Sequence, residues 1–252
     1  MRILLAVLTM FSSLAYSKTI ELTPENTIVL RNEINDKTVS KLQEELAQKV
    51  VQRGLKGYTL YLVLDSPGGS IDAGLNFIEF AKTIPNLETV TLFAASMASA
   101  IVEALPGKRN VTSTGILMFH RAKGSVGGQF ESGELESRLD FYKKIVRNME
   151  QINADRMSMT LQTYKDKVIN ELWILGKDAV KEKAADEVVS IYCSPALVNT
   201  KNIETFSSMD LFAVQVEFSL CPLIKSEKLL EPKKESKYRA YKQEKWNLGF
   251  IK

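Results

Sequence analysis

The sequence predicts an α/β protein built on a largely parallel sheet, and three observations carry that prediction. Apolar, β-branched runs alternate along the chain with segments of helical periodicity, which is the pattern of successive strand–helix units. One run, residues 59–64, is apolar almost throughout, as expected for a strand covered on both faces. The length of 252 residues, with 45% apolar and 25% charged residues, suits one such domain with appendages.

The first half of the chain alternates strands and helices. The expected strands are 27–30, 59–64 and 89–93, and the expected helices run from 35 or 36 to 54, from 70 to about 83, and from 96 to 104. Asn35 or Asp36 can cap the first helix and Ser70 the second, because their side-chain oxygens accept from free N–H groups of the first turn. Pro85 and Pro106 then interrupt the second and third helices.

The second half of the chain changes character after two short strands. The expected segments are strands at 110–112 and 116–119, a glycine-rich stretch at 123–129, a long helix from about 132 towards 159, a helical stretch at 164–172, and a return to the core at 173–189. The long helix has an apolar and a charged side. It therefore either projects to meet another subunit or packs flat on its own domain, and both alternatives stay open.

The first 17 residues have the pattern of a secretory signal peptide. Arg2 gives a positive start, residues 3–15 are almost wholly apolar, and small residues precede Lys18, where cleavage is expected. The apolar run is shorter than the roughly 20 residues that span a membrane, which argues against an uncleaved anchor. The sequence has no cysteine near the expected cleavage site, so we do not expect a lipoprotein. We therefore expect a periplasmic or secreted protein with no stable membrane span after cleavage.

Export favours a disulfide between the two cysteines, Cys193 and Cys221. Closing a loop of that length would stabilise the fold by about 3–4 kcal/mol, whereas the alternative is a pair of free, buried thiols. Neither cysteine has a histidine or cysteine neighbour at ligand spacing, so we expect no metal site.

The net charge of +3, or +2 without Arg2, is too mild to predict nucleic-acid binding.

Three segments carry the groups that a serine hydrolase needs. Ser96 lies among small residues at the expected start of a helix, and His120, the single histidine of the chain, closes a later strand. Imidazole suits base chemistry near neutral pH, and a serine hydroxyl needs such a base. Upstream, a Pro-Gly-Gly turn follows a strand. The N–H of Gly69 in that turn and the N–H of Met97 at the helix start would together hold an oxyanion.

Each of these features alone has a plainer interpretation. Pro-Gly-Gly is most often only a turn, a small-residue helix start is most often close packing, and a lone histidine is more often structural than catalytic. Their order and spacing together indicate catalysis, in which His120 takes the Ser96 proton and passes it to the leaving amine.

On these residues the chain resembles the proteolytic subunit of the Clp protease, a serine peptidase with a crotonase-like fold. The resemblance covers 28–189, and its matching segments are Tyr61–Gly74, Ala94–Ala98, Gly107–Arg109, Met118–His120 and Gly124–Gln129. It implies an α/β fold in which ββα units form a spiral and a long handle helix projects. It also implies Ser96 as nucleophile, His120 as base, and the backbone of Gly69 and Met97 as the oxyanion hole.

The resemblance further implies a domain organisation and partners. A peptidase domain would occupy 18–190, and an extension over 191–252 without counterpart in the family would end, from 225, in a charged tail. Such subunits build homo-oligomeric rings through the handle helix and cleave peptides or unfolded proteins, with 124–129 beside the bound peptide. No cofactor is implied.

The third catalytic residue departs from the family pattern. The family has an aspartate ahead of an aromatic residue and an Ala-Val pair, and here Trp173 and 179–180 place Glu171 at that position. Glutamate keeps the charge but is one methylene longer, so its carboxylate must fold back to reach His120.

Two neighbouring residues and one further departure bear on the site. Asn170 and Asp166 are alternatives for the third position, and an amide in place of the acid costs about 10⁴-fold in such triads. Leu92 and Phe93 replace the family's glycine and polar residue before the nucleophile, which affects the shape of the pocket.

These observations predict an exported serine endopeptidase that works without a Clp ATPase, because ATP is scarce outside the cytoplasm. Loss of the aspartate motivates a different hypothesis, a catalytically inactive ring-forming protein that binds chains or partners. Acyl-CoA chemistry would use the two oxyanion donors but not the pairing of Ser96 with His120. A serine–lysine dyad lacks a clear lysine in the matching region and leaves His120 unexplained.

Overall fold

The structure is a computed structural model that describes residues 18–54, 59–123, 131, 133–208, 212–224 and 227–230. The predicted signal peptide at 1–17, the predicted peptide-binding segment at 124–129 and most of the predicted charged tail lie outside these residues. The chain divides into two compact units, Met1–Ser194 and Pro195–Lys252, so the division falls a few residues after position 190.

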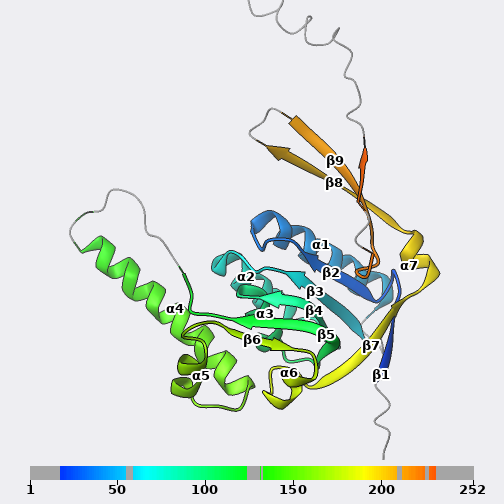
Figure 1. The fold of residues 1–252 in the computed structure, drawn as a ribbon. Coiled ribbons are helices and arrows are strands. Elements are labelled where there is room, and N and C mark those ends of the chain that lie inside the picture. Colours follow the sequence, from blue (N-terminus) through cyan, green and yellow to red (C-terminus); the bar gives the residue numbers. More distant parts are fainter. Residues whose placement is uncertain are drawn as a thin grey trace, which may run out of the picture. The chain divides into compact units, whose positions relative to one another are not determined.

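A seven-stranded sheet forms the centre of the first unit (Figure 1). Its strands are β1 (Lys18–Leu22), β2 (Thr27–Arg31), β3 (Leu60–Ser66), β4 (Leu87–Ala95), β5 (Arg109–Phe119), β6 (Leu172–Leu175) and β7 (Glu187–Cys193). Their order is β1-β7-β5-β4-β3-β2, with β6 paired to β5 outside this order. Only the pairing of β6 with β5 is antiparallel. The predicted α/β class with a largely parallel sheet is therefore confirmed.

Burial of β3 on both faces explains its apolar sequence. Leu62, Val63 and Leu64 are consecutive and all have 0% exposure, although successive side chains of a strand point to opposite faces. Neither face of the sheet is therefore open to solvent at this strand, which agrees with the expectation from residues 59–64.

Helices connect and cover the strands of this unit (Figure 1). They are α1 (Asp36–Arg53), α2 (Ile71–Ala81), α3 (Met97–Ala104), α4 (Glu134–Arg156), α5 (Leu161–Lys167) and α6 (Lys177–Lys181). Asn35 caps α1 in a capping box with Thr38, and Ser70 caps α2 by accepting from the Ala73 N–H. Both predicted caps are thus present, with Asn35 rather than Asp36 at the first.

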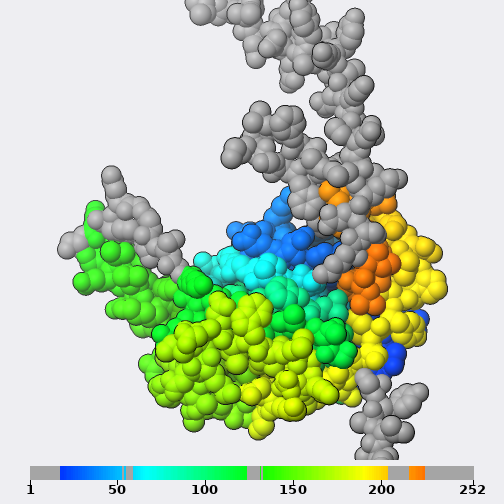
Figure 2. Space-filling model, in the orientation of Figure 1, coloured from blue at the N-terminus to red at the C-terminus, as the bar shows by residue number. Residues whose placement is uncertain are grey.

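The long helix α4 projects from the unit. Within its 23 residues only Asn153 and Ala154, close to its C-terminal end, are buried. Figure 2 shows α4 standing out from the body of the first unit. Of the two arrangements that the sequence left open, the projecting one is observed.

The second half of the sheet differs from the sequence prediction in two places. The expected strands 110–112 and 116–119 are one strand, β5, and its pairing with β4 shifts register between Thr91 and Phe93, so that residues 112–115 are not paired with β4. The expected helical stretch 164–172 ends at Lys167, and Leu172 begins β6, which pairs with the end of β5. Tertiary pairing overrides local helix preference here.

A buried ion-pair network joins α3 to the start of β5. The Arg109 guanidinium lies 2.5 Å from a Glu103 carboxylate oxygen and 2.6 Å from an Asp186 carboxylate oxygen, and it also donates to the Lys183 carbonyl. Arg109 and Glu103 are 5% and 2% exposed. Burial raises the pKa of Glu103 to about 8, although the Arg109 charge opposes the rise. The network fixes the helix that follows Ser96 against the strand that precedes His120.

The second unit contains α7 (Pro195–Asn199) and a three-stranded antiparallel sheet. Its strands are β8 (Lys201–Ser208), β9 (Phe212–Ser219) and β10 (Glu227–Leu230), in the order β10-β9-β8. β10 lies within the segment expected to be a charged tail, so these four residues form a strand instead.

Both cysteines of the chain are disulfide-bonded. Among the residues that the structure describes, no helix has the length and apolar character needed to cross a membrane.

Candidate active site

Three parallel strands deliver the predicted site residues to one edge of the sheet. Gly69 follows β3, Ser96 follows β4 and His120 follows β5, and these strands are neighbours. The carboxyl ends of parallel strands meet at the same edge, which is where open α/β sheets place their sites. Ala95 and Met118, one and two residues before Ser96 and His120, are paired across β4 and β5. The topology thus accounts for the meeting of serine and histidine.

Ser96 occupies a sharp, strained turn between β4 and α3. Its φ and ψ are 56° and −120°, a region that residues with a side chain rarely adopt. The Ser96 N–H donates to the Met118 carbonyl at 2.9 Å, and the Ser96 Oγ lies 2.7 Å from the His120 Nε2. At this separation the hydroxyl proton can pass to the imidazole when the latter is neutral. The predicted pairing of the two side chains is present in the structure.

Close packing by glycine makes this turn possible. Gly68 has a φ of 92°, and a methyl group at its Cα would lie 2.5 Å from the Ala95 carbonyl oxygen and 2.8 Å from the Ser96 Cβ. A side chain at this position would therefore both strain the backbone and push the serine turn away. Gly68 is needed for the position of Ser96.

Replacing Gly68 by alanine is expected to lower kcat for any reaction at Ser96 by at least about 10²-fold, because a displacement of about 1 Å can cost that much. Steady-state kinetics on the variant, with circular dichroism to verify folding, measure the effect. Gly133→Ala is the matched control, since Gly133 also has a positive φ of 87° but nothing lies within 4 Å of an added methyl group. Equal losses in both variants would contradict a specific role for Gly68.

Gly69 and Met97 line the same cavity as Ser96, and the backbone N–H groups of both are candidates for an oxyanion hole. The Ile34 N–H donates to the Gly68 carbonyl and the Ser70 N–H donates to the Ile34 carbonyl, both at 2.8 Å, which fixes the intervening Gly69. Within the described part of the chain, the N–H groups of Gly69 and Met97 have no recorded acceptor. Met97 is the first residue of α3, where N–H groups have no partner in the helix. Both residues line the cavity that Ser96 and His120 line.

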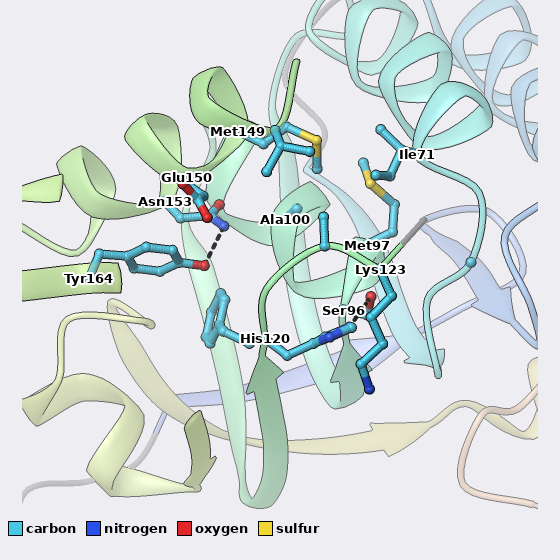
Figure 3. Close-up of a pocket in the computed structure, with 14 residues that line it drawn as sticks. Ile71, Ser96, Met97, Ala100, His120, Lys123, Met149, Glu150, Asn153 and Tyr164 are labelled. Carbon is cyan, nitrogen blue, oxygen red and sulfur yellow. Dashed lines mark hydrogen bonds between the residues drawn. The ribbon is translucent and has the colours of Figure 1, made fainter. Parts of the chain in front are cut away.

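That cavity has a volume of about 250 Å³ and runs between the sheet edge and the helices α4 and α5 (Figure 3). Its lining comprises Gly69, Ile71, Ser96, Met97, Ala100, Phe119, His120, Ala122, Lys123, Val146, Met149, Glu150, Asn153 and Tyr164. Leu92 and Phe93, the departure expected to alter the pocket, are not among the lining residues. They lie instead in β4 at the register shift.

The candidates for the third catalytic residue do not contact His120 in this structure. The Glu171 carboxylate accepts from the Trp173 indole N–H at 3.0 Å, and the Asp166 carboxylate accepts from the Gln162 amide at 2.8 Å. Asn170 is exposed. The His120 Nδ1 is buried, and within the described residues it has no hydrogen-bond partner. The role assigned to Glu171 therefore stays a prediction.

Sequence reasoning missed the polar residues that α4 and α5 contribute to the cavity. Glu150, Asn153 and Tyr164 line it, and the Asn153 side-chain amide donates to the Tyr164 hydroxyl at 2.8 Å. Burial raises the pKa of Tyr164 to about 12, so this phenol stays neutral at physiological pH. The available signal was the spacing of Glu150 and Asn153, which places two polar residues on one side of the helix.

A serine hydroxyl at an imidazole nitrogen, beside two N–H groups without acceptors, is the arrangement found in serine hydrolases. Within the described residues, neither a cluster of potential metal ligands nor a lysine hydrogen-bonded to Ser96 is found. Comparison with known proteins is more specific, because the family model described as Clp protease matches residues 12–191. The chain belongs to the Clp protease family, a family of serine peptidases.

Named relatives share this family at low sequence identity. The ATP-dependent Clp protease proteolytic subunit 2 of Cutibacterium acnes is 31% identical over 134 residues, which is 52% of this chain and 62% of the relative. Subunit 3 of Streptomyces coelicolor is 26% identical over 173 residues, covering 67% of this chain and 77% of the relative. The proteolytic subunit of Streptococcus mutans is 24% identical over 165 residues, covering 64% and 83%. The resemblance predicted from the motifs is thereby confirmed.

Proposed function

We propose that this protein is an exported serine endopeptidase that hydrolyses peptide bonds in peptides or unfolded proteins without an ATPase partner. The observation that carries the proposal is the 2.7 Å separation of the Ser96 Oγ and the His120 Nε2 on a cavity that Gly69 and Met97 also line. Membership of the Clp protease family supports the same chemistry.

The proposed mechanism follows from the positions of these groups. The Ser96 Oγ attacks the scissile carbonyl while His120 takes its proton, and the resulting oxyanion accepts from the N–H groups of Gly69 and Met97. His120 then donates the proton to the leaving amine, which yields an acyl-enzyme on Ser96. Water, deprotonated by His120, releases the second product and restores the serine.

Two features support export. Residues 1–17 have the pattern of a signal peptide, with cleavage expected before Lys18. Cys193 and Cys221 are disulfide-bonded, a state that is common in oxidising compartments and rare where thiols are kept reduced. In such a compartment ATP is scarce, so we propose that the substrate arrives as a peptide or as an already unfolded chain.

Exposed apolar side chains support assembly with further copies of the chain. Phe141 on α4 is 66% exposed, and Trp173 and Leu175 on β6 are each 55% exposed. Large apolar side chains that are exposed on a projecting helix and on a strand are typical of subunit contacts. We propose a homo-oligomeric ring in which α4 meets a neighbouring subunit.

A specific observation favours a second candidate function, a catalytically inactive binding protein that forms the same kind of ring. His120 Nδ1 has no partner among the described residues, whereas the Glu171 carboxylate is bonded to Trp173. Without an acid behind the imidazole, the imidazolium that forms on proton transfer is not stabilised, which costs about 10⁴-fold in comparable triads.

Labelling with a fluorophosphonate probe distinguishes the two candidates. The purified protein, without ATP, is expected to be labelled and to cleave fluorogenic peptides, and mass spectrometry should place the label on the peptide that contains Ser96. The Ser137→Ala variant is the matched control: Ser137 is exposed on α4 and does not line the cavity, so its loss should leave labelling intact. A folded, assembled protein that resists the probe and leaves peptides uncut would favour the inactive binding protein.

A further inference from the structure

We propose that Glu150 is a specificity-determining residue that selects lysine or arginine on the acyl side of the scissile bond. The inference rests on the proposed peptidase function and names the substrate side chain that the same site would take. It depends on the shape of the cavity, on the distribution of polar atoms within it, and on the contacts of the Glu150 carboxylate.

The cavity has the size of a subsite for one side chain. Its 250 Å³ is below the range of about 300–1,000 Å³ that is typical of sites for whole small molecules. Ser96 and His120 line it directly, so a substrate whose carbonyl carbon meets the Ser96 Oγ would place the neighbouring side chain in this space.

Apolar side chains line one side of the cavity, and polar side chains from α4 and α5 lie at the end away from Ser96. Figure 3 shows Ile71, Met97 and Met149 towards one side of the cavity, whereas Glu150, Asn153 and Tyr164 gather away from Ser96. An apolar passage that leads to oxygen atoms favours a side chain with a long hydrocarbon stem and a terminal donor. Lysine and arginine have this build, since both pack their methylene groups on apolar surface and keep a charged head for polar partners.

The Glu150 carboxylate has one oxygen available to such a donor. The Glu150 side chain is 15% exposed, and its Oε2 lies 3.4 Å from the Lys165 ammonium. Lys165 does not line the cavity with Ser96 but lines an adjoining hollow that shares Glu150 with it, so its ammonium contacts the carboxylate from outside the cavity. The Oε1 has no recorded partner in the described part of the chain. Lys165 thus holds the carboxylate in place and leaves one oxygen unpaired.

A second acceptor at the same end also lacks a partner. Asn153 is 6% exposed, and its Oδ1 has no hydrogen-bond partner among the described residues, although its amide nitrogen donates to the Tyr164 hydroxyl. A buried acceptor without a donor costs free energy that a substrate donor would recover. Together, Glu150 and Asn153 present acceptors to a cationic head group.

Among the described residues, Lys123 is the one lysine or arginine that lines the cavity, and its position does not cancel this preference. Lys123 lies at the Ser96 end, and in Figure 3 its ammonium is on the far side of the Ser96–His120 pair from Glu150. A substrate side chain that extends towards α4 therefore meets Glu150 rather than Lys123.

The test compares fluorogenic peptides that differ only at the acyl-side residue: lysine, arginine, leucine or glutamate. The wild-type protein is expected to show a kcat/KM at least about tenfold higher for lysine and arginine than for leucine. Glu150→Gln should lower kcat/KM for the two basic peptides by about 10- to 100-fold and change that for leucine by less than about threefold, because only the basic peptides use the charge.

Two further variants complete the design. Glu150→Lys should reverse the preference towards glutamate, which a merely structural role would not do. Asp140→Asn is the matched control, because Asp140 is on the same helix and pairs with Lys143 but does not line the cavity; all four kcat/KM values should stay unchanged. Wild-type values for leucine and arginine within threefold of each other, or equal losses for all peptides in Glu150→Gln, would overturn the inference.

The outcome separates this inference from the function on which it rests. If the fluorophosphonate probe labels the protein, and the protein cleaves the leucine peptide as well as the basic ones, the proposed peptidase function is supported and the proposed specificity is contradicted. If the protein is neither labelled nor active on any of the four peptides, both the proposed peptidase function and the proposed specificity are contradicted.

Discussion

Replacing Ser96 by alanine is expected to lower kcat for peptide cleavage by about 10⁵- to 10⁶-fold, the scale seen when a serine nucleophile or its histidine is removed in other serine peptidases. The reason is geometric, because the Ser96 Oγ is the hydroxyl that lies 2.7 Å from the single imidazole of the chain. Without it no acyl-enzyme can form, and the N–H groups of Gly69 and Met97 alone would give only a small residual rate. Steady-state kinetics with a fluorogenic peptide measure the loss.

Companion variants show whether serine and histidine act as one unit. His120→Ala should cost about as much as Ser96→Ala, and the double variant should be no slower than either single variant. Glu171→Gln is expected to change kcat by less than tenfold, because the carboxylate is bonded to the Trp173 indole rather than to His120. A 10⁴-fold loss there would instead mean that the carboxylate turns to His120 in the active protein. Activity of Ser96→Ala above about 1% of wild type would place the nucleophile elsewhere.

Replacing Arg109 by methionine is expected to lower the free energy of unfolding by about 3–5 kcal/mol above pH 8, where Glu103 ionises in the wild type, because it leaves that carboxylate buried without its countercharge. The Glu103 side chain is 0% exposed, and its second oxygen has no partner in the described residues even with Arg109 in place. Urea denaturation of the variant and the wild type measures the difference. Lys108→Met is the matched control. It removes the neighbouring cation, whose ion pair with Glu187 is 40% and 31% exposed, and should cost under about 1 kcal/mol.

The deficit of the Arg109 variant should grow with pH. Burial raises the pKa of Glu103 from 4.5 to about 8, partly against the opposing charge of Arg109. The folded protein therefore keeps a proton that the unfolded chain releases, so the contribution of this group is fully present below pH 4.5 and is lost as pH rises through about 8. Without Arg109 the pKa rises further, and the loss at high pH is larger. A deficit that is greater at pH 5 than at pH 8 would contradict this account.

The same network is the reason that we expect the Arg109 variant to lose activity at temperatures below its unfolding transition. Glu103 is near the end of the helix that Ser96 begins, and Arg109 starts the strand that leads to His120. Loosening the contact between that helix and that strand moves the two catalytic groups relative to one another. A 2.7 Å contact does not tolerate a displacement of 1 Å without a large loss in rate.

Much of the fold was predictable because local signals and burial agree. The apolar run 59–64 gave a strand because both of its faces are covered, and Asn35 and Ser70 marked helix starts because their side chains satisfy N–H groups of the first turn. Where pairing between distant segments decides the structure, prediction from local pattern was wrong. β6 replaces the end of an expected helix because it pairs with β5. β5 is a single strand that pairs with β4 and β7 near its start and with β4 and β6 near its end.

By itself the sequence determined the order of the elements and the kinds of group at the site: a serine at a helix start, a single histidine at a strand end and glycines in a turn. These follow from residue type and near neighbours, since capping, periodicity and turn chemistry act over a few residues. Only the tertiary structure decided that α4 projects, that the Glu171 carboxylate turns to Trp173, and that Glu150 and Asn153 face the cavity of Ser96. Which polar atoms meet across a cavity depends on how strands and helices from distant parts of the chain pack together, and no local pattern encodes that packing.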